Sequence, residues 1–174
     1  MRERNELILA DMIAVRAEKN PALDVLTFEH ASLDGGATPD EVRTYADLQT
    51  NANVLAAELI RRGMERGDRF ALMQRNHPEF VEAMIAASIT ATACVPIDPR
   101  CKGEKLAYML ANSGCKGVIC ADYCLEQVAA VREKVDGCDW VLALESGDAG
   151  VPALSDFPGV DSLGEAMSKP AASG

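Results

Sequence analysis

Asp98 and Arg100 are the side chains whose types and position best suit chemistry, because they follow an apolar run in the stretch ATACVPIDPR, residues 91–100. The run stops at Pro96, and Asp98, Pro99 and Arg100 follow within four positions. If the run is a buried strand, its charged end lies at a sheet edge where ligands bind, and the helix that follows could help hold an anion there. The alternative is a solvated connection whose prolines only stop the strand. Residue types and spacing leave both interpretations open.

Other sequence signatures of catalysis are absent from the chain. No GxGxxG or GxxxxGK[ST] pattern marks a nucleotide loop, and no serine sits in a nucleophile elbow. His77 precedes Pro78 and is expected to be an exposed histidine at a helix start, while His30 lies in a turn region. The residues by themselves therefore assign no catalytic side chain.

The cysteines are spaced in a way that argues against a metal site. Cys120 and Cys124 are four positions apart, no CxxC pair exists, and neither histidine is near them. In a reducing compartment, buried thiols that pack as small apolar groups are expected. The full set is Cys94, Cys101, Cys115, Cys120, Cys124 and Cys138.

The composition is that of an ordinary globular domain with an excess of acidic residues. The 174 residues are 48% apolar and 25% charged, with a net charge of −10. Nucleic-acid binding is not expected, because the phosphate backbone selects clustered Lys and Arg. The one basic cluster, in residues 61–69, is interrupted by Glu65 and Asp68 and is typical of the end of a helix.

Neither a secretory signal nor a membrane span is expected. The N-terminal stretch MRERNELILADMIAV carries Glu6 and Asp11 within its apolar part. The longest uncharged run, residues 83–97, is shorter than the roughly 20 apolar residues that cross a bilayer, and it contains Pro96. A cytoplasmic protein is therefore expected.

The first part of the chain predicts a helix, a hairpin and a second helix. Apolar spacing predicts the first helix over residues 5–19. Strands at residues 24–29 and just before Thr44 are expected to pair through a turn at residues 33–40. Thr44 and Asp47 have the spacing of a capping box for the next helix.

A strand-and-helix unit then recurs along the chain. Strands are predicted at residues 69–74, 92–97, 116–121 and 140–144, each a short apolar run suited to burial on both faces. Helices are predicted between them, with Asn76 and Asp122 as expected caps. This rhythm predicts an α/β fold with a doubly wound parallel sheet and alternating helices. The stretch 91–100 then ends at the carboxyl edge of the sheet, where such folds bind ligands.

The chain is expected to contain one α/β unit and a less structured end. Residues 1–145 form the unit in this interpretation, and residues 146–174 form a linker or a surface tail. The second segment is rich in Gly, Pro, Ser and Ala, and only SLGEAM at 162–167 suggests a helical turn.

Four motifs together resemble the adenylate-forming (AMP-binding) superfamily, which includes acyl-CoA synthetases, the adenylation domains of peptide synthetases and luciferases. They are RTYADL (43–48), GDRFALMQRNHPEFVEAMIAA (67–87), ATACVPIDPR (91–100) and EKLAYMLANSGCKGVI (104–119). Each motif alone is weak, but their order and spacing resemble those of the family. The PEF and VPIDPR motifs look most like those of carboxylate–CoA ligases.

The resemblance implies that the chain is the first subdomain of the large N-terminal domain of such a ligase. The full-length enzyme would use ATP, Mg²⁺ and CoA to convert a small-molecule carboxylate to an acyl-adenylate and then to a CoA thioester. The family's phosphate loop, its adenine- and ribose-binding motifs and its catalytic lysine are missing from these residues. The resemblance therefore carries over no catalytic residue, and no cofactor is expected to be bound by this chain alone.

Arg100 is the one site residue that the resemblance carries over. In CoA ligases, a basic residue directly after the Asn-Pro pair that ends this strand can approach the nucleotide phosphates of CoA, and Arg100 holds that position here. Two positions depart from the family pattern. Ala91 stands where a glycine usually ends the helix before the strand at residues 92–97. Cys101 stands where a Thr or Ser usually caps the helix after that strand.

Two other functions stay open at this stage. The chain also resembles adenylation domains that load a carrier protein, and it could instead be a complete, non-catalytic module that binds a ligand or a partner. For the ligase, the expected partner is the remainder of the same enzyme. The face that this remainder covers would be apolar enough to favour self-association of the chain.

Overall fold

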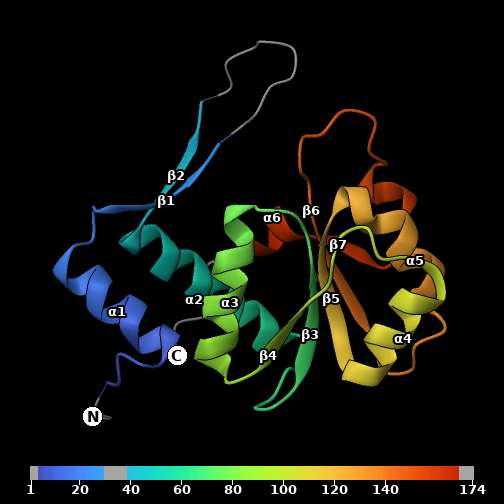
Figure 1. The fold of residues 1–174 in the computed structure, drawn as a ribbon, viewed down its shortest axis with the longest axis horizontal. Helices are drawn as coiled ribbons and strands as arrows, with labels where there is room; N and C mark the ends of the chain where they lie inside the picture. Colours follow the sequence, from blue (N-terminus) through green and yellow to red (C-terminus); the bar gives the residue numbers. More distant parts are fainter. Residues whose placement is uncertain (1–3, 30–38, 169–174) are drawn as a thin grey trace.

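The structure, a computed structural model, describes residues 4–29 and 39–168, and its centre is a five-stranded parallel sheet (Figure 1). The strand order is β4-β3-β5-β6-β7. The strands are β3 (Arg69–Met73), β4 (Ala93–Pro96), β5 (Cys115–Ala121), β6 (Trp140–Leu144) and β7 (Val160–Ser162). The predicted doubly wound parallel α/β sheet is confirmed, because neighbouring strands pair in parallel throughout.

Helices cover both faces of this sheet. One face carries α2 (Tyr45–Arg61), α3 (Pro78–Thr90) and α6 (Leu163–Met167), and the other carries α4 (Gly103–Ser113) and α5 (Leu125–Arg132) (Figure 1). Side chains along β5 alternate between the two cores: Val118 and Cys120 pack toward α4 and α5, and Ile119 packs toward α2 and α3. This double burial explains why the strands are continuous apolar runs rather than alternating ones.

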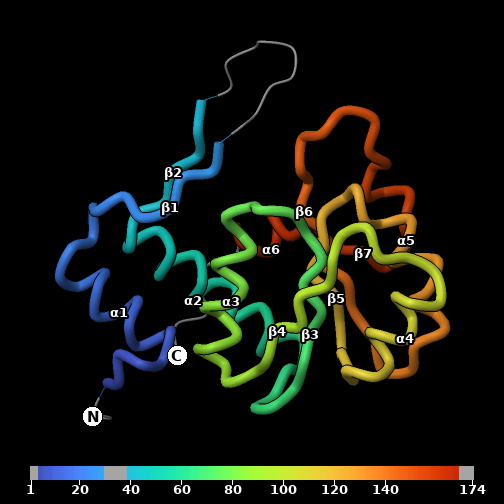
Figure 2. The backbone as a smooth tube through the Cα atoms, in the orientation of Figure 1, coloured from blue at the N-terminus to red at the C-terminus, as the bar shows by residue number. Residues whose placement is uncertain are grey.

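The N-terminal part packs outside α2 and α3. Helix α1 (Leu9–Lys19) buries Ile13 against Leu48, Ala52 and Ile85, in a third apolar cluster. Strands β1 (Asp24–Phe28) and β2 (Glu41–Thr44) form the predicted antiparallel hairpin, which Figure 2 shows projecting from the helices. The predicted turn at residues 33–40 lies largely outside the described residues.

A buried carboxylate ties the hairpin to the helices. Glu82 on α3 is 1% exposed, and its Oε1 accepts hydrogen bonds from Arg43 Nε at 3.0 Å and from Asn51 Nδ2 at 2.7 Å. Arg43 belongs to β2 and Asn51 to α2, so three elements share one buried charge pair. Removing either partner of such a pair is costly, because the remaining charge is left buried.

The structure confirms one predicted helix cap and shows that three others are wrong. Thr44 and Asp47 form the predicted capping box on α2. Asn76 does not cap α3, because Pro78 occupies the first helical position and makes His77 the cap residue, without a side-chain cap bond. Helix α4 begins after Lys102 rather than Cys101.

Asp122 also has a different role from the predicted helix cap. It begins a short 3₁₀ turn, η1 (Asp122–Cys124), and α5 starts only after Cys124. Its carboxylate bonds to Tyr123 and Ser146 instead of to the first turn of α5.

Residues 146–174 are more structured than the expected linker or tail, where the structure describes them. A second 3₁₀ turn, η2 (Leu154–Asp156), leads to β7, which pairs with β6. Helix α6 then buries Leu163 and Ala166 against the sheet. The apolar residues of this region are few and separated, so their periodicity was too weak to predict a strand. The division of the chain at residue 145 itself stays a prediction.

No helix in residues 4–29 and 39–168 has the length and apolar character that crossing a bilayer requires.

Ala91 ends α3 in a backbone conformation that glycine prefers. Its φ is 54° and its ψ is 30°, in the left-handed region, and it is the one non-glycine residue with positive φ in the described parts of the chain. Its backbone N–H bonds to Ala87 O, as in an ordinary helix end. The alanine at this helix end therefore places a Cβ in a strained position.

Ala91→Gly is expected to raise the free energy of unfolding by about 0.5–1 kcal/mol, because glycine relieves the left-handed strain while adding some entropy to the unfolded chain. Urea unfolding measures the change. Gly63→Ala is the matched control, since Gly63 has a φ of 78° and open space around its Cβ position. The control should destabilise the protein, and a destabilising Ala91→Gly would contradict the account.

Candidate functional site at the carboxyl edge of the sheet

The strand order places a topological switch point between the carboxyl ends of β3 and β5. From β3 the chain passes through α3 to β4 on one side, and it then crosses through α4 to β5 on the other side. The connections that leave β3 and β5 therefore run to opposite faces of the sheet. Ligands of open α/β sheets bind at such a switch point.

Three neighbouring strand ends supply polar side chains near this switch point. Arg75 and His77 follow β3, Asp122 and Tyr123 follow β5, and Ser146 and Asp148 follow β6. We call these six residues the switch-point cluster. Because β3, β5 and β6 are neighbours in the sheet, residues about 70 positions apart in the chain meet here.

Tyr123 is the centre of the switch-point cluster. Its hydroxyl oxygen accepts the backbone N–H of Arg75 at 2.6 Å and lies 3.1 Å from His77 Nε2. The guanidinium carbon of Arg75 lies 4.0 Å from the centroid of the Tyr123 ring, within cation–π range. The His77 ring is in turn 5.2 Å from the ring of Phe28, between centroids, which connects the cluster to the hairpin.

A buried carboxylate positions the loop after β6. Asp122 is 3% exposed, and its two oxygens accept the backbone N–H of Ser146 at 2.8 Å and the hydroxyl of Ser146 at 2.6 Å. The backbone N–H of Asp148 bonds to Ser146 Oγ at 3.2 Å, and the carboxylate of Asp148 pairs with Arg75. The loop is thereby held against the end of β3.

Burial shifts the titration of two groups in the cluster. Desolvation lowers the pKa of His77, and the nearby Arg75 charge lowers it further. Desolvation also raises the pKa of Tyr123. Both shifts favour the neutral forms of the two side chains, which share a hydrogen bond between Tyr123 Oη and His77 Nε2.

Asp98 and Arg100 lie on the loop after β4, at the same edge of the sheet. Arg100 donates from Nε to Asp98 Oδ1 at 3.0 Å and from Nη2 to Asp98 Oδ2 at 2.7 Å. These bonds hold the pKa of Asp98 well below its usual range. The Arg100 side chain is 90% exposed, so it presents its remaining donors to solvent. The loop is anchored through Pro99 O, which accepts from Gln127 on α5.

A cavity of about 470 Å³ adjoins the switch-point cluster on the hairpin side. It lies between β1 and the start of α3, and its walls include Leu26, Phe28, Asn76, His77 and Phe80. Its volume is within the range of small-molecule sites.

Gln74 leaves an unpaired polar group at the end of β3. The residue is 3% exposed, and neither its Oε1 nor its Nε2 has a hydrogen-bond partner in the described parts of the chain. Such groups are rare in native proteins.

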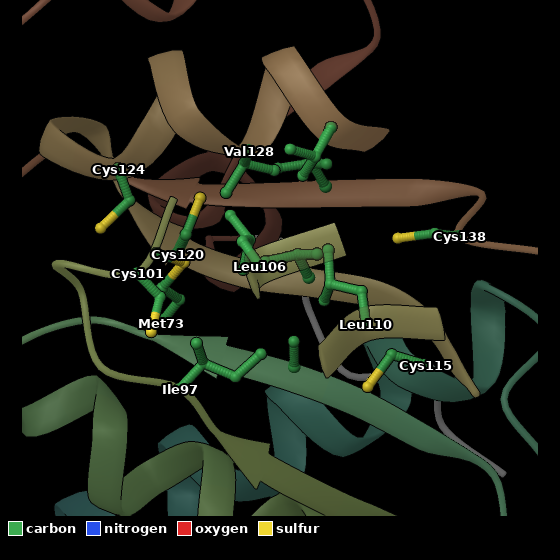
Figure 3. Close-up of a cluster of buried hydrophobic side chains, with 14 of the residues drawn as sticks. Met73, Ile97, Cys101, Leu106, Leu110, Cys115, Cys120, Cys124, Val128 and Cys138 are labelled. Atoms are coloured by element: carbon green, nitrogen blue, oxygen red, sulfur yellow. The ribbon is translucent and has the colours of Figure 1, made fainter. Parts of the chain in front are cut away.

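All six cysteines are free thiols, and five of them are buried. Figure 3 shows Cys101, Cys120 and Cys124 beside Met73 at one end of the core under α4 and α5, with Cys115 and Cys138 at the other end. Burial raises the pKa of Cys124 and of Cys138 to about 11, so both stay protonated and weakly nucleophilic. Among the described residues, no group of three His, Cys, Asp or Glu side chains could hold a metal ion.

The model of the AMP-binding enzyme family matches residues 13–171. The chain belongs to this family. The predicted family is therefore confirmed, and the match extends well beyond the motifs in residues 43–119 that carried the prediction.

Curated relatives of the chain include CoA ligases and a peptide synthetase. The 4-hydroxybutyrate–CoA ligase 2 of Metallosphaera sedula is 30% identical over 109 residues, which cover 63% of this chain and 20% of that protein. The long-chain-fatty-acid–CoA ligase FadD13 of Mycobacterium tuberculosis is 30% identical over 126 residues, covering 70% and 25%. Bacitracin synthase 1 of Bacillus licheniformis is 33% identical over 120 residues, covering 65% and 2%. The chain thus spans about a quarter or less of these relatives.

Solved structures share the fold. A long-chain-fatty-acid–CoA ligase (FadD1) of Archaeoglobus fulgidus superposes with a TM-score of 0.73 at 22% identity, covering 95% of this chain and 30% of that one. The fatty acid AMP ligase of Legionella pneumophila gives a TM-score of 0.57 at 26% identity, covering 65% and 19%. The first likeness extends over nearly all of the chain and shows that its fold recurs inside a longer protein.

The sequence predicted which residues lie at the carboxyl edge of the sheet after β4, but it did not predict the residues at this edge that make the most side-chain contacts. Asp98 and Arg100 lie at the carboxyl edge, as their position after an apolar run predicted. His77, expected to be exposed, is half-buried and bonded to Tyr123. Tyr123 itself was missed, because a tyrosine after a buried strand has no distinctive spacing. Its position directly after Asp122 at a strand end was the only available signal.

His77 is expected to make the protein less stable as the pH falls. Its pKa is lowered in the folded state, so the unfolded chain takes up the proton first, near its ordinary pKa of about 6.5. The free energy of unfolding should therefore fall as the pH decreases through the ordinary histidine range, between about pH 7.5 and pH 5.5.

His77→Gln should remove this part of the pH dependence while leaving other titrating groups unchanged. Urea unfolding at both pH values for the two proteins measures the difference. An identical pH dependence in the variant would contradict the burial of a neutral His77.

Proposed function

We propose that the chain is the N-terminal portion of an ATP-dependent carboxylate–CoA ligase. The family match over residues 13–171 supports this most directly. The CoA ligases among the relatives support CoA as the acceptor of the acyl group. In the proposed reaction, a carboxylate oxygen attacks the α-phosphorus of ATP and releases pyrophosphate. The CoA thiolate then attacks the acyl carbon of the adenylate, and AMP leaves.

The described residues would supply part of the binding surface rather than the reacting groups. They contain no glycine-rich phosphate loop and no acidic cluster suited to Mg²⁺. ATP and Mg²⁺ would therefore be held mainly by the remainder of the enzyme, which is also the proposed partner of this chain. This chain alone is expected to bind no cofactor tightly.

Arg100 is the proposed contact of this chain with CoA. Its guanidinium fits a phosphate through paired donors, and its 90% exposure leaves it accessible at the carboxyl edge. Asp98 keeps the guanidinium in place through two bonds and leaves other donors unused. CoA would contribute the thiol that accepts the acyl group, while Arg100 would orient its nucleotide end.

A second candidate is an adenylation domain that loads a carrier protein. The similarity to bacitracin synthase 1 favours it specifically. The first half-reaction would be the same, but the acceptor thiol would belong to a carrier protein, and Arg100 would have no CoA phosphate to contact. A stand-alone binding module would perform neither half-reaction.

Two further expectations belong to this proposal. The enzyme would be cytoplasmic, where six thiols remain reduced. Self-association of the isolated chain through the face normally covered by the remainder stays a prediction.

Carboxylate-dependent exchange of pyrophosphate into ATP tests the proposed adenylation. The protein that contains this chain together with its remainder should catalyse exchange with at least one acid from a panel of short, long and aromatic carboxylates. The 174-residue chain should give none under the same conditions. Lack of exchange by the longer protein with every acid, or exchange by the short chain, would contradict the proposal.

Arg100→Ala in the full-length enzyme should raise the KM for CoA by about 10- to 100-fold, because a charge-assisted hydrogen bond contributes about 1.5–3 kcal/mol. The KM for ATP should not change. Arg66→Ala is a matched control, since Arg66 is also exposed but lies at the opposite edge, before β3. An unchanged KM for CoA in the Arg100 variant would place Arg100 outside the CoA site.

A further inference from the structure

The switch-point cluster holds an arginine that is oriented before any ligand binds. The guanidinium of Arg75 stacks on the Tyr123 ring, with 4.0 Å from its carbon to the ring centroid. Stacking leaves the edge of the guanidinium plane, which carries its N–H donors, free to bind an anion. A side chain that is already ordered loses less conformational entropy on binding than a free one.

The Tyr123 side chain on which Arg75 stacks is itself held in place. The Tyr123 hydroxyl accepts the backbone N–H of Arg75 at 2.6 Å and is 3.1 Å from His77 Nε2. These contacts join the residues that follow β3 to the residues that follow β5. The stacked pair is therefore built into two neighbouring strand ends at the switch point, rather than formed by two mobile surface side chains.

A carboxylate from the chain itself already occupies one side of this guanidinium. Asp148 Oδ2 pairs with Arg75 Nη2, and Asp148 lies on the loop that Asp122 anchors through Ser146. The two side chains are 56% and 44% exposed. Ion pairs this exposed contribute little to stability, so an external anion can displace the carboxylate at small cost.

We propose that Arg75, stacked on Tyr123, is a binding subsite for the phosphate group of a ligand, and that Asp148 fills this subsite as an internal substitute anion when no ligand is bound. The subsite is separate from Arg100, which follows β4 and pairs with Asp98. Phosphate suits Arg75 better than a second carboxylate does, because its tetrahedral oxygens can accept from several of the five guanidinium donors at once. The proposal rests on the geometry of this chain and does not depend on the ligase reaction.

Titration of the 174-residue chain with inorganic phosphate at constant ionic strength tests the subsite, with amide and guanidinium NMR signals as the readout. The signals of the Arg75 backbone N–H, Arg75 Nε–H and the Ser146 and Asp148 amides should shift together and saturate. Arg75→Gln should abolish the saturable shift. Arg66→Gln makes the same charge change at the opposite edge and should leave the shift intact.

Two further variants test the roles of Asp148 and of stacking. Asp148→Asn should tighten phosphate binding by about two- to fivefold, because the competing anion is removed. Arg75→Lys keeps the charge but loses the planar stack, and it should weaken binding at least threefold, about 0.6 kcal/mol by RT ln 3.

Three outcomes would overturn the proposal. The first is a shift that never saturates or that persists in Arg75→Gln. The second is unchanged or weaker phosphate binding in Asp148→Asn. The third is acetate binding as tightly as phosphate, which would assign the subsite to carboxylates instead.

Discussion

The pairing of β3 with both β4 and β5 is the constraint on which the rest of the structure depends. β3 is the strand at which the winding direction reverses, and Phe70 to Met73 are completely buried between the two helical layers. Because the strands run in parallel, all their carboxyl ends meet at one edge. Every polar residue with a candidate role, from Arg75 to Asp148, is positioned by that single arrangement.

The same edge combines rigidity with exposed charge. The buried Asp122 carboxylate fixes the loop after β6, and Pro99 O fixes the loop after β4 to α5. Arg100 extends from the loop after β4, and Arg75 follows β3, where its backbone N–H bonds to Tyr123; both guanidinium groups are exposed. In a chain with a net charge of −10, each of these arginines is paired with a carboxylate of the chain, Arg75 with Asp148 and Arg100 with Asp98.

The elements and the parallel sheet could be predicted from the sequence, and side-chain contacts between distant segments could not. The four strands and the Thr44 capping box depend on residues adjacent in sequence, and the structure contains both. His77 was expected to be exposed because its burial depends on Phe28 and on Tyr123, which is 46 positions away. β7 has only three residues and no apolar run, so it is stabilised by pairing with β6 rather than by its own pattern. Arg100 was placed at the correct edge, but its bonds to Asp98 required the turn geometry.

Product stoichiometry tests the central claim most directly. The full-length protein, supplied with its carboxylate, ATP and CoA, should form acyl-CoA, AMP and pyrophosphate in equal amounts, as mass spectrometry and nucleotide chromatography would show. Formation of ADP and phosphate, or of adenylate without any CoA thioester, would contradict the assignment of this chain to a carboxylate–CoA ligase.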